Sequence, residues 1–267
     1  MLGGSPNPLY VASRAALLDV LEALGVHANR VVLVGAQAVY LRCDAMSLAI
    51  APFTKDADLA LIPPPGTEPA LEDAMRAAGL EQRGDEPGIW VREGAEVDLL
   101  VPTGLADPAG RRGARLEGHS STAARKVLGL EGAAVDADPM RIPALAPSDA
   151  RSAVIRVAGP AALLVAKVHK VTEKPPSPAL RKDAYDIYRL LVATDTEELV
   201  RRVRMLRSNP LSADVTATAL AQLARLFGEA SSPGSLMAGA AEEGVGNPAN
   251  VAASVSALAA DLLDALL

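Results

Sequence analysis

The chain has 267 residues, of which 50% are hydrophobic and 22% are charged, and its formal net charge is −6. This composition excludes an intrinsically disordered chain and is typical of a globular protein with one large or two modest domains. Because Cys43 is the only cysteine, an internal disulfide framework is excluded and a reducing compartment is indicated. The sequence lacks a secretion signal at its start and an apolar stretch of about 18 residues. We therefore expect a cytoplasmic protein that does not span a membrane.

The net negative charge argues against a protein that coats nucleic acid through bulk electrostatics. Basic residues nevertheless gather locally along the sequence. They are Arg111, Arg112 and Arg115; Arg125 and Lys126; Lys167 to Lys182; and Arg201, Arg202, Arg204 and Arg207. Each cluster is either a solvated helix face or a surface that contacts phosphate groups.

The first half of the chain alternates between helix and strand patterns. Residues 10–25 carry leucines at helical spacing and end at Gly25, a usual C-terminal stop. The elements expected next are a strand at 31–34, a helix at 36–43, a strand ending at 62, a Pro-rich loop at 63–65, a helix at about 68–78, and strands near 80–83, 88–92 and 96–101. We interpret residues 112–157 as further strands and loops. The pattern predicts an α/β fold with a mixed sheet and flanking helices.

From Pro160 onward the pattern is helical. Pro160 fits the first position of a helix, and the Pro175-Pro176 pair interrupts the chain. The helices expected after this interruption lie near 179–193, 195–206, 211–230 and 248–266. We therefore predict a C-terminal helical bundle and two domains, residues 1–158 and 159–267.

Three aspartates suggest a metal-dependent site. Asp56 and Asp58 alternate at the head of an apolar strand, so their side chains are expected on the same face. Two like charges at that separation repel each other unless a cation such as Mg²⁺ lies between them. Asp98 lies in a later apolar strand, where a buried carboxylate without a partner is costly. We predict metal ligation by Asp56 and Asp58 and a functional role for Asp98.

Other kinds of site receive no support from the sequence. His27, His119 and His169 do not have the spacing of zinc ligands, and Cys43 has no partner. A phosphate-binding loop of the Gly-x-x-x-x-Gly-Lys type is absent. With two Phe, one Trp and four Tyr, the chain lacks an aromatic platform for stacking single-stranded bases.

The order of these motifs resembles a known superfamily. Val34-Gly35-Ala36, a helix, Thr54-x-Asp56-x-Asp58 and then Asp98 resemble the nucleotidyltransferase superfamily of polymerase β. A downstream segment that contains Lys167, Lys170, Lys174 and Arg181-Lys182-Asp183 is similar to that of the AbiEii-like toxins of bacterial abortive-infection and toxin–antitoxin systems. The resemblance covers roughly residues 31–192.

The resemblance implies an enzyme that transfers a nucleoside monophosphate from an NTP to an acceptor hydroxyl. The implied catalytic residues are Asp56, Asp58, Asp98, Lys167 and Asp183, with Mg²⁺ or Mn²⁺ on Asp56 and Asp58. The implied contacts to the NTP are Gly35, Ala36, Thr54, Lys55 and Lys170. Either Asp98 or Asp183 would deprotonate the acceptor. By the same resemblance, the acceptor is the 3′ end of a tRNA and the protein is a growth-inhibiting toxin with a cognate antitoxin.

The chain departs from the family pattern in two places. Ala36 stands where the superfamily usually has glycine or serine, and Ala51-Pro52-Phe53 lacks the arginine that often precedes the Thr/Ser-x-Asp-x-Asp motif. Backbone N–H groups at a helix N-terminus can still bind phosphate without a side chain. Two alternatives remain open: a degenerate transferase fold that binds a nucleotide or a protein, and a transferase acting on a protein or on a small molecule such as an aminoglycoside.

Overall fold

The computed structural model describes residues 6–43, 49–62, 71–108, 112–173 and 175–267. Two compact units make up the chain. The first comprises Met1–Gln37, Pro52–Val127 and Ala137–Val157, and the second comprises Ala38–Ala51, Leu128–Asp136 and Ala158–Leu267. The expected division into two domains, residues 1–158 and 159–267, stays a prediction. The second unit does, however, include two segments from the first half of the chain.

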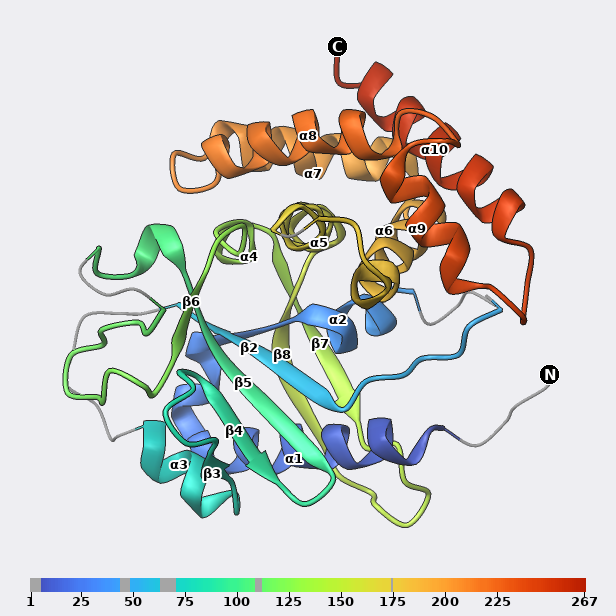
Figure 1. The fold of residues 1–267 in the computed structure, drawn as a ribbon. Coiled ribbons are helices and arrows are strands. Elements are labelled where there is room, and N and C mark those ends of the chain that lie inside the picture. The colour runs from blue at the N-terminus through green and yellow to red at the C-terminus, as the bar shows by residue number, and fades with distance from the viewer. Residues whose placement is uncertain (1–5, 44–48, 63–70, 109–111, 174) are drawn as a thin grey trace. The chain divides into compact units, whose positions relative to one another are not determined.

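The first unit is built on a mixed β-sheet (Figure 1). Its strands are β1 (Val31–Val34), β2 (Asp56–Leu61), β3 (Glu81–Gln82), β4 (Ile89–Arg92), β5 (Ala95–Pro102), β6 (Arg125–Val127), β7 (Ala137–Pro143) and β8 (Ser152–Ala158). Within the described residues the strand order is β3-β4-β5-β2-β1-β8-β7, and β6 also pairs with β5. β2 runs parallel to β5 and antiparallel to β1.

Helices accompany this sheet. They are α1 (Pro8–Leu24), α2 (Gly35–Arg42) and α3 (Leu71–Ala77), together with the 3-10 turns Gly25–Arg30 and Thr103–Leu105. Only the first turn of α2, up to Gln37, belongs to the first unit. α1 begins where Asn7 accepts a hydrogen bond from the Leu9 backbone N–H, and it ends at Gly25, whose φ of 55° is easily adopted by glycine. α1 packs against β2 and β5, and so covers one face of the central strands.

The second unit is helical. It contains α4 (Gly132–Val135), α5 (Pro160–Thr172), α6 (Arg181–Ala193), α7 (Thr196–Ser208), α8 (Ala213–Phe227), α9 (Pro233–Ala241) and α10 (Pro248–Asp264), with a 3-10 turn at Pro178–Leu180. Pro160 occupies the first turn of α5, and Asp195 caps α7 by accepting hydrogen bonds from the backbone N–H groups of Glu197 and Glu198. α7 to α10 are the orange to red helices of Figure 1.

The predicted fold class is confirmed: an α/β sheet with flanking helices precedes C-terminal helices. The expectation that residues 112–157 form only strands and loops was wrong, because α4 lies there. Its four residues are too few to show a helical period. α9 was also missed, although Ser232-Pro233 has the composition of a helix start. The Pro-rich loop at 63–65 and the expected helical residues 68–70 lie outside the described residues.

Candidate functional site

The turn from β1 into α2 is shaped around an aspartate. Gly35 has a φ of 66°, which favours glycine, and the β1–β2 register places Asp58 opposite Val34. A Cβ added to Gly35 would overlap the Asp58 carboxylate and approach its Cγ to 2.6 Å. Glycine is therefore required here for two reasons, backbone conformation and space. The fold thus brings together two residues that were each predicted for the site, Gly35 and Asp58.

Four carboxylates share one face of the two central strands. The parallel register of β2 and β5 aligns Asp56 with Glu96 and Asp58 with Asp98. Aligned residues of neighbouring strands point to the same side of a sheet, and alternate residues of one strand do likewise. We call these four residues the carboxylate row. Residues of opposite parity, including Ala57 and Val97, are fully buried on the other face.

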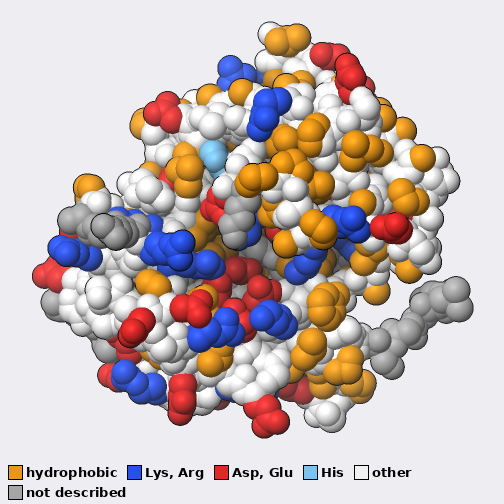
Figure 2. Space-filling view, viewed as in Figure 1, with side chains coloured by type: hydrophobic (Ala, Val, Ile, Leu, Met, Phe, Trp, Pro, Cys, Tyr) orange, Lys and Arg blue, Asp and Glu red, His pale blue; other side chains and the backbone are white. Residues whose placement is uncertain are grey.

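Cationic side chains neutralise part of the carboxylate row. Arg83 binds Glu96 with both terminal nitrogens, at 2.6 Å (Nη2–Oε2) and 3.3 Å (Nη1–Oε1). Lys55 adds a 3.2 Å ion pair to Glu96, and Arg125 from β6 pairs with Asp98. Acidic and basic side chains adjoin each other over the visible face of the first unit in Figure 2. Within the row, these three cations thus pair with Glu96 and Asp98.

Asp98 is the most unusual member of the row. It is 5% exposed, and one of its oxygens, Oδ1, is buried without a hydrogen-bond partner among the described residues. Burial, together with the nearby Glu96 and Asp56, raises the pKa of Asp98 to about 6 against the attraction of Arg125. A carboxylate with a pKa near neutrality can accept a proton from a substrate hydroxyl.

A buried network supports the start of β2. The Thr54 hydroxyl donates to Asp56 Oδ1, and the side chain of Gln37 donates to the Asp56 backbone carbonyl at 3.2 Å. Gln37 is itself fixed by Arg14, whose Nε donates to Gln37 Oε1 at 2.7 Å. Ala36 is buried beside Gln37 at the start of α2 and has no hydroxyl to offer. The network fixes the backbone that carries Asp56.

Lys167 and Asp183, the other predicted catalytic residues, belong to the second unit, where they form a separate ion cluster. Lys167 Nζ lies 2.6 Å from Asp183 Oδ1 and 2.7 Å from Asp186 Oδ2. Burial alone would lower the pKa of Lys167, but the attraction of Asp186 and Asp183 outweighs burial and raises it. Burial alone would raise the pKa of Asp183, but the attraction of Lys167 and its hydrogen bond lower that pKa. We call Lys167, Asp183, Asp186 and the neighbouring Arg189 the lysine cluster.

Arg189 extends this cluster toward the aromatic residues of the second unit. Its guanidinium lies 4.8 Å from the ring centre of Tyr185 and 5.3 Å from that of Tyr40, and it donates to the backbone carbonyl of Ile50. Lys170, by contrast, is exposed and only approaches Glu173 at 3.9 Å. Lys170, the lysine of this helix expected to contact the NTP, is thus open to solvent, whereas Lys167 is buried.

The carboxylate row fits a divalent cation by its chemistry. Mg²⁺ and Mn²⁺ bind oxygen ligands, and Mg²⁺ commonly uses one or two carboxylates together with substrate phosphates. Asp56 and Asp58 supply such a pair, and the unpartnered Oδ1 of Asp98 is a further oxygen in the row. No group of three or more His, Cys, Asp or Glu side chains in the described part of the chain is arranged to hold a metal ion. The fit is therefore to a two-carboxylate site.

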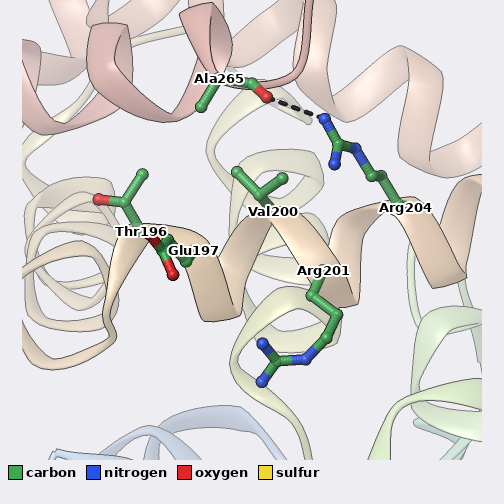
Figure 3. Close-up of a pocket in the computed structure, with 6 residues that line it drawn as sticks. All are labelled: Thr196, Glu197, Val200, Arg201, Arg204 and Ala265. Atoms are coloured by element: carbon green, nitrogen blue, oxygen red, sulfur yellow. Dashed lines mark hydrogen bonds between the residues drawn. The ribbon is translucent and has the colours of Figure 1, made fainter.

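A cavity of about 540 Å³ lies elsewhere, in the second unit, and is open to solvent (Figure 3). Residues of α7 and the end of α10 line it: Thr196, Glu197, Val200, Arg201, Arg204 and Ala265. Arg204 donates to the Ala265 backbone carbonyl at 3.2 Å, and Arg201 pairs with Glu198. None of the residues predicted for the site lines this cavity.

Sequence reasoning missed Glu96, Arg83 and Arg125 as neighbours of the predicted aspartates. Glu96 could have been found, because it lies two residues before Asp98 and so shares its face. The arginines come from distant segments and give no such signal.

Among the described residues, no helix is long and apolar enough to cross a bilayer. The chain matches neither a protein-family model nor a curated protein.

Proposed function

We propose that the protein is a metal-dependent nucleotidyltransferase that moves a nucleoside monophosphate from an NTP to an acceptor hydroxyl. The proposal rests on one arrangement: Asp58 lies over the obligatory Gly35 turn and in register with Asp98 on the next strand. That arrangement joins a phosphate-binding turn, a pair of metal-binding carboxylates and a proton acceptor on one face of one sheet.

Each residue of the row has a distinct role in this proposal. Asp56 and Asp58 would hold Mg²⁺ or Mn²⁺, which supplies charge neutralisation of the triphosphate. The backbone amides of Gly35 and Ala36 and the exposed Lys55 would contact phosphate oxygens. The acceptor oxygen forms a bond to the α-phosphorus, the bond from that phosphorus to the bridging oxygen breaks, and pyrophosphate leaves.

The proton of the acceptor hydroxyl goes to Asp98 in this scheme. Its pKa is raised to about 6 and its Oδ1 is without a partner in the described residues, which suits a proton acceptor. Asp183, the other residue implied as the base, is held by Lys167 at 2.6 Å, and Lys167 lowers its pKa against the effect of burial. These contacts favour Asp98 as the base and a positioning role for Asp183.

The acceptor follows from the resemblance alone. We propose the 3′ end of a tRNA, and with it a growth-inhibiting toxin that a cognate antitoxin would counteract in the cytoplasm. A protein hydroxyl or a small molecule such as an aminoglycoside is the alternative acceptor for the same chemistry.

A second candidate function is a nucleotide- or protein-binding module without catalysis. It is favoured by Ala36, which offers no hydroxyl to a triphosphate, and by Arg125, which neutralises Asp98 from within the chain. Under this reading the carboxylate row is retained for binding, and replacing its aspartates leaves the biological effect intact.

Transfer of label separates the two functions. Purified protein is incubated with each α-labelled NTP, Mg²⁺ and total RNA or lysate. Asp58→Asn is tested beside the matched control Asp73→Asn, which replaces an exposed aspartate that pairs with Arg76. We expect label on tRNA with the wild type and the control, and a loss of at least about a thousandfold with Asp58→Asn. Label on protein or small molecules would change the acceptor. No label anywhere would favour the binding module.

A further inference from the structure

The ion pair between Arg125 and Asp98 leaves both partners incompletely bonded. Arg125 Nη2 donates to Asp98 Oδ2, but Asp98 Oδ1 and Arg125 Nε are each buried without a hydrogen-bond partner in the part of the chain that is described. Buried polar atoms are nearly always bonded, because an unmade hydrogen bond in a buried place is costly. Arg125 Nε, a strong donor, and Asp98 Oδ1, a strong acceptor, are therefore each able to bind a further group.

The other members of the carboxylate row are bonded more completely. Glu96 is held by both terminal nitrogens of Arg83 and also by Lys55. The Asp56 carboxylate accepts from the Thr54 hydroxyl. Because Arg125 uses a single nitrogen on Asp98, this contact can be exchanged at a lower cost than the two-nitrogen contact of Arg83.

The strand register gives Arg125 access to a substrate on this face. Arg125 aligns with Leu100 on β5, two residues beyond Asp98, so its side chain emerges on the same side as the row. That side chain is 31% exposed, whereas that of Asp98 is 7% exposed. The guanidinium can thus reach solvent while its carboxylate partner stays buried. A planar guanidinium with several donors is well suited to phosphate oxygens.

We propose that Arg125 binds the polyphosphate of the nucleotide, and that Arg125 pairs with Asp98 as long as no polyphosphate is bound. Phosphate oxygens would then replace Asp98 on the guanidinium. The exchange releases both oxygens of Asp98 for the acceptor hydroxyl, so a bound nucleotide prepares the base. The nucleotide as ligand rests on the proposed function, whereas the competition between Asp98 and phosphate for Arg125 can be tested without it.

The test is a double-mutant cycle on binding of inorganic pyrophosphate with a chelator present, so that neither metal nor transfer is needed. Binding is followed by calorimetry and by the fluorescence of Trp90, the single tryptophan, which lies on β4 and donates to the Ala123 carbonyl two residues before Arg125. The variants are Asp98→Asn, Arg125→Gln and the two combined. A matched cycle replaces Asp98→Asn by Glu96→Gln, which frees Arg83 and Lys55 instead.

We expect Asp98→Asn to tighten pyrophosphate binding by about tenfold or more, since one charge-assisted hydrogen bond no longer competes. That gain should vanish in the Arg125→Gln background, whereas the gain from Glu96→Gln should persist there. An equal gain from Asp98→Asn in both backgrounds would mean simple charge removal and would overturn the proposal. So would the absence of any gain from Asp98→Asn.

Loss of folding is a separate outcome that the design can recognise. Thermal unfolding identifies a misfolded Arg125→Gln protein, and Arg125→Lys then takes its place, because it keeps the charge but loses the planar fork. With that variant the gain from Asp98→Asn should shrink, and an unchanged gain would overturn the proposal. The labelled-nucleotide assay is independent of both cycles: transfer without coupling refutes only the role of Arg125, and coupling without transfer refutes only the transferase.

Discussion

The carboxylate row of the first unit and the lysine cluster of the second unit both gather acids and bases, but they balance them differently. In the cluster, Lys167 bonds to both Asp183 and Asp186, while Asp186 Oδ1 and Arg189 Nε lie 3.8 Å apart without a hydrogen-bond partner in the described residues. In the row, Arg125 pairs with Asp98 through Nη2, and Asp98 keeps an oxygen without a partner within the described residues. A cation bonded to two carboxylates stabilises structure, whereas a buried carboxylate whose pKa is raised is suited to a proton or a cation.

The largest effect is expected when the positive charge of Lys167 is removed, because this change tests whether the lysine cluster is structural. Lys167→Met leaves Asp183 and Asp186 buried without their shared cation, and we expect a loss of about 3–5 kcal/mol in the free energy of unfolding. The matched control is Lys170→Met on the same helix. It removes an exposed 3.9 Å contact to Glu173 and a weaker attraction to Asp183 than that of Lys167, and it should cost less than about 0.5 kcal/mol. Urea unfolding followed by circular dichroism measures both, and equal losses would show that the cluster is not structural.

Acid should affect the two regions in opposite directions. The pKa of Asp98 is about 6 in the folded protein and 3.8 ordinarily, so between these values the folded state binds the extra proton. The contribution of Asp98 to the free energy of unfolding therefore decreases as the pH rises from about 4 to 6, by up to about 3 kcal/mol. For Asp183, whose pKa is lowered, stability is present above the ordinary pKa and is lost as the pH falls.

Stability curves between pH 3 and 8, measured with a chelator present, check this expectation. Asp98→Asn should remove its part of the slope, and Asp73→Asn, on the exposed side of α3, is the matched control for the loss of a carboxylate. If the Asp98→Asn curve runs parallel to that of the wild type, the raised pKa is refuted.

A glycine pair sharpens the comparison at the turn beside Asp58. Gly35 and Gly79 have φ values of 66° and 74°, but only at Gly35 would a Cβ meet the carboxylate, whereas nothing lies within 4 Å of a Cβ at Gly79. Alanine at either position should cost about 1–2 kcal/mol of stability through backbone strain. Only Gly35→Ala displaces Asp58, so we expect transfer of labelled nucleotide to fall by about a hundredfold with that variant alone. Equal transfer by both variants would contradict the role given to Asp58.

The smallest effect is expected at the exposed edge of the row. Lys55 is 60% exposed and adds a third contact to Glu96, which Arg83 already holds. Lys55→Gln should change the free energy of unfolding by less than about 0.5 kcal/mol, and it should weaken NTP binding mainly at low salt. Thermal unfolding and nucleotide titrations at two salt concentrations measure these effects. A large loss of stability would mean that the row depends on Lys55 for its structure.

Local patterns in the sequence predicted the parts of the fold that depend on a repeating period or on a cap. The apolar run at β1, the alternation at β2 and Pro160 at the start of α5 each carry their own signal. α4 and α9 were missed, since four residues show no period and α9 contains Gly234 and Gly239. Those glycines are explained by tertiary packing, because a Cβ at Gly234 would press on the Phe227 ring.

For the candidate site, the sequence indicated only which residues of a single strand share a face. Asp56, Asp58 and Asp98 were named from their strands, but their register against each other is a property of the sheet. Arg125 lies 27 residues from Asp98, and nothing in its local sequence indicates that contact. Lys167 was named through the resemblance, and nothing in its own apolar helix indicates its two aspartate partners from α6. Charge partners between distant elements were the information that the sequence did not provide.

The chain enters the second unit three times, and this has a consequence for synthesis on the ribosome. All residues of the first unit have been made once Val157 has been added, so its sheet can form while the helices that follow are still being translated. Ala38–Ala51 and Leu128–Asp136 have to wait for those helices. Tyr40 then lacks Arg189, and Asp136 lacks Arg202, until α6 and α7 have been translated. A fragment that ends at residue 158 would retain this unfinished state permanently.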